Sequence, residues 1–217
     1  MNTHPCLIET PSLGMCWLEV SQRILGHGWL ARYDGLPIKE LANLTLVVAS
    51  PDPDDDVIAR LGDAAWLKWM HENFFVQKEV EELGRAPSYA VRLFNYGQQG
   101  RDQIQWVVER LKHHAESRSA TITTFMPLTD TSYIPCISLL DFWLPHEKVE
   151  LIVYAHSLDF GKKAYGNLIE LAQLQHSVAH QLGRPIGTLT IHAKSAHIYD
   201  TEWEYMEHLL QNAHRHV

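Results

Sequence analysis

Apolar residues recur at three- and four-residue steps in several segments of the chain, which is the spacing of one face of an α-helix. The clearest such segment is 168–182, and Gly183 follows it as a residue that commonly ends helices. The same spacing predicts further helices over 16–25, 57–75, 102–113 and 201–214. Each of these helices would bury one apolar face and leave the opposite face in water.

Short segments rich in β-branched and other apolar residues predict strands over 41–49, 121–125, 137–144, 150–154 and 188–193. Strands and helices mix without a strict β-α-β alternation, which favours an α+β fold over a Rossmann sheet. Segment 50–56, with two prolines and four aspartates, is interpreted as a solvated loop before a helix. The sequence contains no internal repeat, and residues 1–217 are predicted to form a single domain.

The composition is that of an ordinary globular protein: 46% of the 217 residues are apolar, 20% are charged, and the net charge is −8. Because there is no basic excess to neutralise phosphates, we expect no nucleic-acid partner. The apolar runs are far shorter than the roughly 20 residues that span a bilayer, and no secretory signal is visible, so we expect no membrane partner. Three cysteines without a paired framework favour a reducing, cytoplasmic compartment.

Reactive side chains lie where the predicted strands begin or end. Cys136 stands after a proline at the start of one strand, and His156 and Asp159 follow another. His197 and Tyr199 come after a third strand and are two residues apart, so in an extended chain they share one face. On its own, a cysteine in this setting is more often a small buried apolar residue. A thiol, an imidazole and a phenol brought together instead suit covalent catalysis with relayed protons.

In the spacing of these residues the chain resembles the thymidylate synthase family, including its pyrimidine-nucleotide hydroxymethylase branches. That family places Arg-Ser-x-Asp twenty residues after a Pro-Cys nucleophile, an Asn eleven residues beyond the Arg, and His-x-Tyr thirty beyond the Asn. The same separations are found here among Cys136, His156, Asn167 and His197. The resemblance extends over about 89–199, roughly half of the chain.

The resemblance implies a thymidylate synthase-type fold, with a mixed β-sheet flanked by helices and a homodimer formed by packing sheet to sheet. It implies that the Cys136 thiolate adds to C6 of a pyrimidine nucleotide and that C5 then takes the one-carbon unit of 5,10-methylenetetrahydrofolate. The C5 hydrogen would leave through water held by groups such as His197 and Tyr199. Hydride from the reduced folate then gives a methyl group, whereas water gives a hydroxymethyl group.

The resemblance also implies roles in substrate binding. By matching position, Asn167 would hydrogen-bond the N3 and O4 edge of the base, and Asp159 would help to hold the base. The family's cytosine-specific members tend to carry Asp at the Asn167 position, so Asn favours uracil. Ser157 would contact a phosphate oxygen, and His197 and Tyr199 would also reach the sugar hydroxyl.

Three arginines match substrate-binding positions of the family. Arg92 ends a segment like its Tyr-Gly-x-x-Arg turn, Arg118 follows a similar helix and would cross the dimer interface, and Arg32 loosely matches a mobile N-terminal arginine. At two positions the sequence differs from the family pattern. His156 replaces an arginine that contacts both phosphate and the nucleophilic sulfur, and Ser119 replaces a second interface arginine. We therefore expect activity to follow the charge state of His156 as well as that of the thiol.

The catalytic carboxylate and the cofactor site are matched less closely. The family's Glu-x-x-Trp is represented by Asp63 and Trp66, with Asp63 one methylene shorter, and Glu40 is a second candidate carboxylate. Trp66 belongs to an aromatic cluster that would wall the pterin site or else form part of the core. Lys163 and its neighbour Lys162 fall where the family uses glycine. This pair would supply charge for a phosphate or a folate tail, or else form a solvated turn.

The product of the reaction is left open. Eighteen residues follow Tyr199, as in the family's short archaeal-type members, and a less complete lid would favour capture of water. Methylation is the main expectation, and 5-hydroxymethylation of a pyrimidine nucleotide or nucleoside is the alternative. A third hypothesis, motivated by Asp63 and His156, is a family member that binds nucleotides without catalysis. His176 and His180 share a helix face but lack a third ligand, so we expect no metal site.

Overall fold

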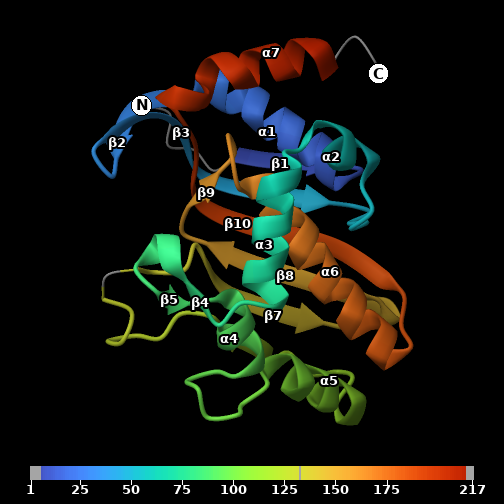
Figure 1. Ribbon diagram of the computed structural model, residues 1–217. Coiled ribbons are helices and arrows are strands. Elements are labelled where there is room, and N and C mark those ends of the chain that lie inside the picture. Colours follow the sequence, from blue (N-terminus) through green and yellow to red (C-terminus); the bar gives the residue numbers. More distant parts are fainter. Residues whose placement is uncertain (1–5, 132, 214–217) are drawn as a thin grey trace.

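A computed structural model describes residues 6–131 and 133–213 of the chain. Its main feature is a mixed eight-stranded sheet with the order β1-β3-β10-β8-β7-β6, in which β2 pairs with β3 and β9 with β10 (Figure 1). The strands are β1 (Cys6–Thr10), β2 (Trp29–Tyr33), β3 (Leu36–Val48), β6 (Ala120–Thr123), β7 (Ile137–Trp143), β8 (Val149–Ala155), β9 (Leu158–Asp159) and β10 (Ile186–Tyr199). A small separate sheet pairs β4 (Glu79–Val80) with β5 (Ala86–Pro87). The α+β expectation is confirmed.

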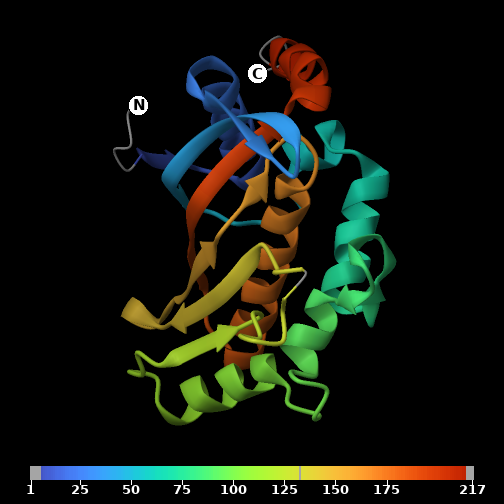
Figure 2. The same cartoon turned by 90° about the vertical axis from the view of Figure 1, so that its left-hand side faces the viewer.

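The principal helices lie on one side of the large sheet (Figure 2). They are α1 (Leu13–His27), α2 (Asp56–Leu61), α3 (Ala64–Phe75), α4 (Tyr89–Phe94), α5 (Gln103–His113), α6 (Ala164–Leu182) and α7 (Trp203–Ala213). Short 3₁₀ turns complete the described elements: η1 (Glu81–Leu83), η2 (Pro145–Glu147) and η3 (Asp200–Glu202). Helix α6 lies directly against β8 and β10, and α3 packs on the outer side of α6. The chain thus forms a sheet, a helix layer and an outer helix.

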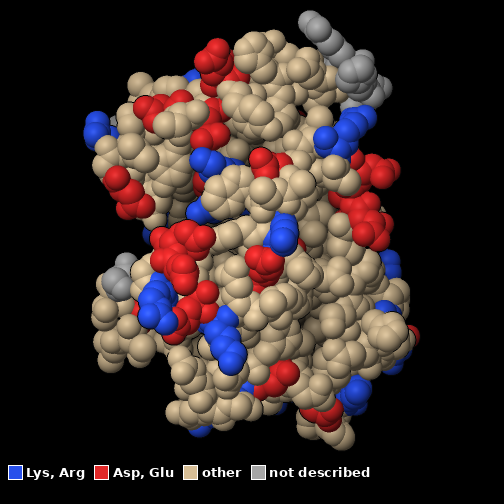
Figure 3. Space-filling view, in the orientation of Figure 1, with Lys and Arg blue, Asp and Glu red and all other residues tan. Residues whose placement is uncertain are grey.

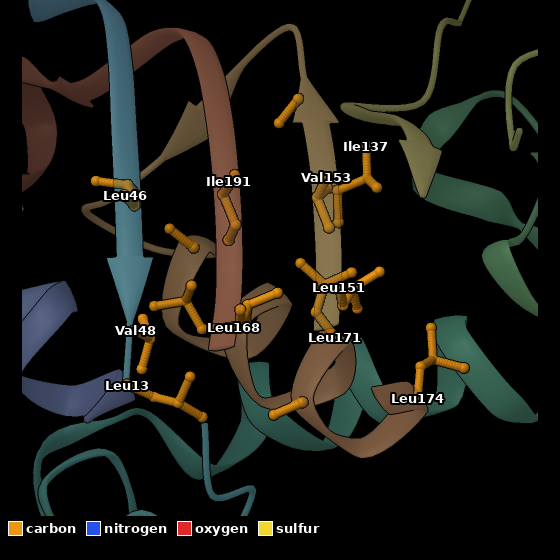
Figure 4. Packing of buried hydrophobic residues seen from close by; sticks show 14 of the residues in the cluster. Leu13, Leu46, Val48, Ile137, Leu151, Val153, Leu168, Leu171, Leu174 and Ile191 are labelled. Atoms are coloured by element: carbon orange, nitrogen blue, oxygen red, sulfur yellow. The ribbon is translucent and has the colours of Figure 1, made fainter. Parts of the chain in front are cut away.

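The core lies between α6 and the sheet. Leu168 and Leu171 on α6 point toward Val153 on β8 and Ile191 on β10 (Figure 4). All four side chains are buried, and burying each side chain of this size stabilises the fold by about 1.5–3 kcal/mol. The apolar stripe predicted over 168–182 is therefore the face that holds α6 on the sheet.

Polar caps explain where several helices begin. The side chains of Ser12, Asp55, Ser88 and Asp102 accept backbone N–H groups in the first turns of α1, α2, α4 and α5. Asp55 comes from the segment interpreted as a solvated loop, and its carboxylate also accepts the N–H of Gly14 at 2.9 Å. This loop is therefore tied to α1 as well as leading into α2.

Several expectations about the elements were wrong in extent. The single helix expected over 57–75 is two helices, because Gly62 ends α2 and Asp63 caps α3. Strand β10 runs on to Tyr199, so His197 and Tyr199 lie within the strand and not after it. The β2–β3 hairpin was not predicted, although Asp34 and Gly35 have the positive φ angles, 49° and 79°, that suit a two-residue hairpin turn. The last residue of the helix expected over 201–214 lies outside the described residues.

The described surface shown in Figure 3 carries acidic and basic side chains interspersed, with no continuous basic area on that face. This mixture agrees with the net charge of −8. None of the described helices has both the length and the apolar character needed to cross a bilayer.

Candidate active site

A cavity of about 410 Å³ opens beside the sheet where β8 ends, between the β2–β3 hairpin, the start of α6 and helix α3. Its size is in the range of small-molecule sites. Eight of the residues predicted from the sequence line it: Cys136, His156, Ser157, Asp159, Lys163, Asn167, His197 and Tyr199. They come from four separate parts of the chain, so the fold brings residues that are distant in the sequence to one cavity.

Cys136 lies immediately before β7, and its backbone is held on both sides. Its carbonyl oxygen accepts the N–H of His156 at 2.9 Å, and the next N–H, that of Ile137, donates to the phenolic oxygen of Tyr89 at 3.0 Å. Burial raises the pKa of the Cys136 thiol to about 11, with the charge of Lys163 acting in the opposite direction. In the free protein at neutral pH the group is therefore a thiol that a ligand or a proton acceptor must activate.

His197 and Tyr199 share one face of β10, as their spacing predicted. Their ring centroids are 5.1 Å apart, and Tyr33 from the β2–β3 hairpin lies 5.4 Å from His197 and 6.4 Å from Tyr199. Burial lowers the pKa of His197 to about 4, and burial together with Asp159 and neighbouring groups raises the pKa of Tyr199 above its ordinary value. At neutral pH the cavity therefore holds a neutral imidazole beside a protonated phenol.

A hydrogen-bonded chain behind His197 sets which of its nitrogens carries the proton. Ser195 donates from Oγ to Glu40 at 2.5 Å, and the same oxygen lies 3.5 Å from Nδ1 of His197. Because the carboxylate only accepts, Ser195 can offer His197 a lone pair, which favours a proton on Nδ1 and leaves Nε2 as an acceptor. Glu40, a candidate catalytic carboxylate, does not line the cavity and contacts Ser195 instead.

Two carboxylates do line the cavity. Asp159 lies at the end of β9, and its Oδ1 accepts the N–H of Gly161 at 3.1 Å. Burial raises its pKa to about 6, and Lys163 opposes that shift. Asp34, at the tip of the β2–β3 hairpin, was not singled out from the sequence. The Asp-Gly pair there was the available signal, since it marks a tight hairpin whose tip can reach over a neighbouring site.

Asn167 and His156 also line the cavity. Asn167 lies in the first turn of α6, where its Nδ2 donates to the carbonyl of Lys163 at 3.1 Å. His156 is half-buried, with Nδ1 3.5 Å from Oγ of Ser138. Burial, and then the charge of Lys194, lowers the pKa of His156. His156 is therefore neutral at pH 7 and does not replace the permanent charge of a guanidinium.

The structure corrects the expected role of Arg92. Its side chain is 1% exposed and does not line the cavity that holds Cys136. Two parallel hydrogen bonds of 2.8 Å join its guanidinium to Asp130, and it also donates to the carbonyls of Thr124 and Pro87 at 2.7 and 2.9 Å. With its donors used in this way, Arg92 holds together the segments around α4 and is not free to bind substrate.

The other two arginines are also outside the cavity of this chain. Arg118 is exposed and donates to the carbonyl of Glu116 at 3.0 Å. Arg32 is exposed on β2 and donates to the carbonyl of Gly35 at 2.5 Å. Neither side chain lines the cavity of its own chain. The roles expected for them, Arg118 across a dimer interface and Arg32 as a mobile phosphate ligand, therefore stay predictions.

Asp63 takes a different place from the one expected, and Trp66 takes the second of its two expected places, packed against the core. Asp63 is exposed, and its Oδ1 accepts the N–H groups of Ala65 and Trp66 at 2.8 and 3.1 Å, so it caps α3 and does not line the cavity. Trp69, one turn later, is the tryptophan that lines the cavity. Trp66 packs edge-on against it, with ring centroids 5.6 Å apart. Trp66 therefore supports the cavity wall from behind.

Within residues 6–131 and 133–213, no three His, Cys, Asp or Glu side chains are grouped so that they could hold a metal ion. Of the two histidines considered as zinc ligands, His176 has Nε2 3.0 Å from the carbonyl oxygen of Pro51. The cavity is thus a site of one thiol, neutral proton-transfer groups, two carboxylates and one ammonium.

Comparison with known proteins identifies the family of the chain. A family profile described as "Thymidylate synthase" matches residues 41–217. The chain belongs to the thymidylate synthase family. Members of this family are one-carbon transferases that act on pyrimidine nucleotides with folate-derived donors, and the chain is an enzyme of that class.

Relatives cover nearly the whole chain. A protein of Methanosarcina mazei named "Putative thymidylate synthase" is 32% identical over 213 residues, which are 94% of each chain. A protein of the same name from Methanococcoides burtonii is 31% identical over 214 residues, again 94% of each chain. The "Thymidylate synthase" of Varicella-zoster virus is 31% identical over 143 residues, 61% of this chain and 48% of the viral protein. The family resemblance seen over about 89–199 therefore extends well toward the N-terminus.

Proposed function

We propose that this enzyme transfers a one-carbon unit from 5,10-methylenetetrahydrofolate to C5 of a uracil nucleotide, reducing it to a methyl group, through a covalent bond between Cys136 and C6 of the base. The observation that carries the proposal is the convergence of Cys136, Asn167, His197 and Tyr199 on one cavity from separate elements. Without a nucleophile beside groups that recognise the ring, the cavity would be suited to binding alone.

Asn167 and Cys136 would act on opposite parts of the base. The amide of Asn167 offers an acceptor to N3–H and a donor to O4, which is the pattern of a uracil edge. When Sγ of Cys136 bonds to C6, the C5–C6 electron pair moves toward C5 and O4, and C5 becomes nucleophilic. A donor placed at O4 stabilises the negative charge that develops there.

His197, Tyr199 and Asp159 would handle the protons. Neutral His197, with Nε2 as acceptor, would receive a hydrogen bond from a sugar hydroxyl. The phenol of Tyr199 and the carboxyl of Asp159, whose pKa of about 6 lies near neutrality, would hold the water that takes the C5 proton. Ser157, buried at the end of β8, would donate to a phosphate oxygen.

The residues present fit a pterin-type donor in one respect. Trp69 gives the cavity a flat apolar wall, and the ammonium of Lys163 lies 5.3 Å from the centre of that ring. When bound, 5,10-methylenetetrahydrofolate supplies the one-carbon unit and the hydride. Trp69 would orient its ring system and help to exclude water from it.

We propose further that the enzyme is a homodimer that packs sheet to sheet. The sheet face opposite α6 is not covered by a helix in the described chain (Figure 2). Three large side chains remain exposed on its strands β7 and β8: Leu139 at 37%, Trp143 at 36% and Tyr154 at 43%. Arg118, which does not line the cavity of its own chain, would then be placed to serve the partner's site. A Trp143→Glu variant should shift the mass in solution from dimer to monomer, and an unchanged mass would count against this interface.

The experiment that tests the reaction uses pyrimidine nucleotides and nucleosides carrying tritium at C5, incubated with methylenetetrahydrofolate. The proposal predicts release of tritium to water by the wild-type protein and its loss in Cys136→Ala. Cys6→Ala, which changes a cysteine outside the cavity, is the matched control and should retain the activity. No release from any substrate, or equal release by Cys136→Ala, would contradict the proposal. The product mass then tells methyl from hydroxymethyl.

A further inference from the structure

The site has a nucleophile without the cation expected to support it. A cysteine attacks as a thiolate, and a nearby positive charge lowers the free energy of that anion. The position twenty residues after the nucleophile carries His156, whose pKa is lowered by burial, so it is neutral at pH 7. Arg92 is committed to Asp130. Within the described chain, a different group must therefore balance the charge on Cys136.

Lys163 is placed to do this. It stands at the start of α6, with its N–H bonded to the carbonyl of Asp159 at 3.0 Å, and its side chain lines the same cavity as Cys136. Among the residues that the structure describes, it is the only lysine or arginine in that lining. Its Nζ lies 5.4 Å from the ring centre of Trp66 and 5.3 Å from that of Trp69, within the range of a cation–π contact with both rings.

The charges around Cys136 act in opposite directions. Lys163 is the largest influence that lowers the pKa of the thiol, whereas burial, Asp159 and Asp34 raise it. The other titratable groups that line the cavity carry no charge near pH 7. They are two histidines with lowered pKa values, His156 and His197, and four phenols, those of Tyr33, Tyr89, Tyr133 and Tyr199. Among the described residues, the balance of charge at the sulfur is therefore between one ammonium and two carboxylates.

We propose that Lys163 is the cation that pairs with the Cys136 thiolate, and that it replaces in function the guanidinium absent at position 156. The inference rests on the proposed role of Cys136 as the nucleophile. The thiol loses its proton to the surrounding water while Lys163 keeps its own. When the bond from Sγ to C6 forms, the negative charge passes from sulfur to the O4 side of the base. Lys163 thus contributes by stabilising the anion before attack.

Lys162 provides a matched control. It is the adjacent residue and also lies over Trp66, with Nζ 5.7 Å from the ring centre. Its ammonium, however, is paired with Glu202 at 3.0 Å, and its side chain does not line the cavity. Changing Lys162 therefore removes one lysine and one contact with Trp66 without removing a charge from the cavity.

The test measures the thiol in the free protein and needs no substrate. The rate of carboxamidomethylation of Cys136 by iodoacetamide is followed from pH 7 to 10 by the mass of the peptide that contains it. Well below the pKa of the thiol this rate is proportional to the thiolate fraction. Lys163→Met should lower it about tenfold at each pH, which corresponds to one pKa unit, while Lys162→Met leaves it unchanged. Lys163→Arg should keep the wild-type rate.

A rescue variant keeps the result interpretable. Adding His156→Arg to Lys163→Met should restore the rate, because it places a permanent cation beside the same sulfur. Lys163→Gln, with a matching thermal unfolding midpoint, controls for misfolding. Equal rates in wild type and Lys163→Met would overturn the proposal, as would equal losses in Lys162→Met and Lys163→Met. Either result would leave tritium release by the wild-type enzyme, and hence the proposed function, unaffected.

Discussion

The phenolic oxygen of Tyr89 accepts the N–H of Ile137 at 3.0 Å, one residue beyond Cys136. Tyr89 is itself held from two sides: its N–H donates to Oδ1 of Asn73 at 3.0 Å, and its ring stacks on Phe74 with centroids 4.4 Å apart. The helices α3 and α4 therefore determine where the sheet presents the thiol.

Tyr89→Phe should destabilise the protein by about 1–3 kcal/mol, because it leaves the buried N–H of Ile137 without an acceptor. The expected loss of activity should lie in kcat more than in KM, since the thiol is displaced while the binding groups remain. Urea unfolding and steady-state kinetics measure the two effects. Tyr205→Phe, at an exposed tyrosine of α7, is the control and should change neither quantity. An unchanged stability for Tyr89→Phe would show that this hydrogen bond does not hold the segment.

A second prediction concerns the two carboxylates Asp63, which caps α3, and Asp159, which lines the cavity. Asp63→Asn should keep activity within about twofold, because asparagine caps a helix about as well as aspartate and the side chain does not line the cavity. Asp159→Asn should lower kcat on the order of 100-fold, as expected for loss of a proton-transfer group. Tritium release measures both variants. A larger loss in Asp63→Asn than in Asp159→Asn would return Asp63 to the catalytic role.

The buried pair of Arg92 and Asp130 gives a third prediction, concerning stability. Arg92→Met or Asp130→Asn alone should each lower the free energy of unfolding by about 3–5 kcal/mol, because each leaves a buried partner uncompensated. The double variant should lose less than the sum of the two. Strict additivity in urea unfolding would mean that the two side chains do not act as a pair.

The fourth prediction concerns pH. His197 has a pKa of about 4 in the fold and an ordinary value of 6.5, so between those values only the unfolded chain binds the proton and stability falls as pH falls. Asp159, with a pKa raised from 3.8 to about 6, acts in the opposite sense over nearly the same window. His197→Gln should therefore lose less stability than wild type on going from pH 7 to pH 4, by at most about 3 kcal/mol.

Asp159→Asn should have the opposite effect to His197→Gln on the pH dependence of stability. It removes the contribution that offsets the protonation of His197, so it should lose more stability than wild type between pH 7 and pH 4. Thermal unfolding midpoints at half-unit steps of pH measure the three curves. Parallel curves for all three proteins would contradict the assigned shifts.

The sequence predicted which residues meet at one cavity better than it predicted the structure around that cavity. Spacing along the chain brings Cys136, Asn167, His197 and Tyr199 to one cavity, because the strands and α6 near them have strong apolar patterns. A sequence does not show which partner a charged group finds. Arg92 was a candidate for binding substrate, but it pairs with Asp130, thirty-eight residues away, and this buried pair has a structural role.

The misplaced elements have similar physical causes. The apolar spacing over 57–75 continues through Gly62 and Asp63, so periodicity alone does not reveal that α2 ends and α3 begins there. That break moves Asp63 from a possible cavity position to the helix cap. Conversely, Asp34 reaches the cavity only through the β2–β3 hairpin, a pairing that depends on contacts with β3 and not on its own short segment.

The central claim is that Sγ of Cys136 bonds to a pyrimidine ring, and trapping that bond tests it most directly. A 5-fluoropyrimidine nucleotide, incubated with methylenetetrahydrofolate, should remain attached because C5 carries fluorine in place of the proton that must leave. Mass spectrometry of the digested protein should then show the peptide containing Cys136 heavier by the nucleotide and the folate together. An unmodified Cys136 peptide, or the added mass on Cys6 or Cys16 instead, would contradict the account.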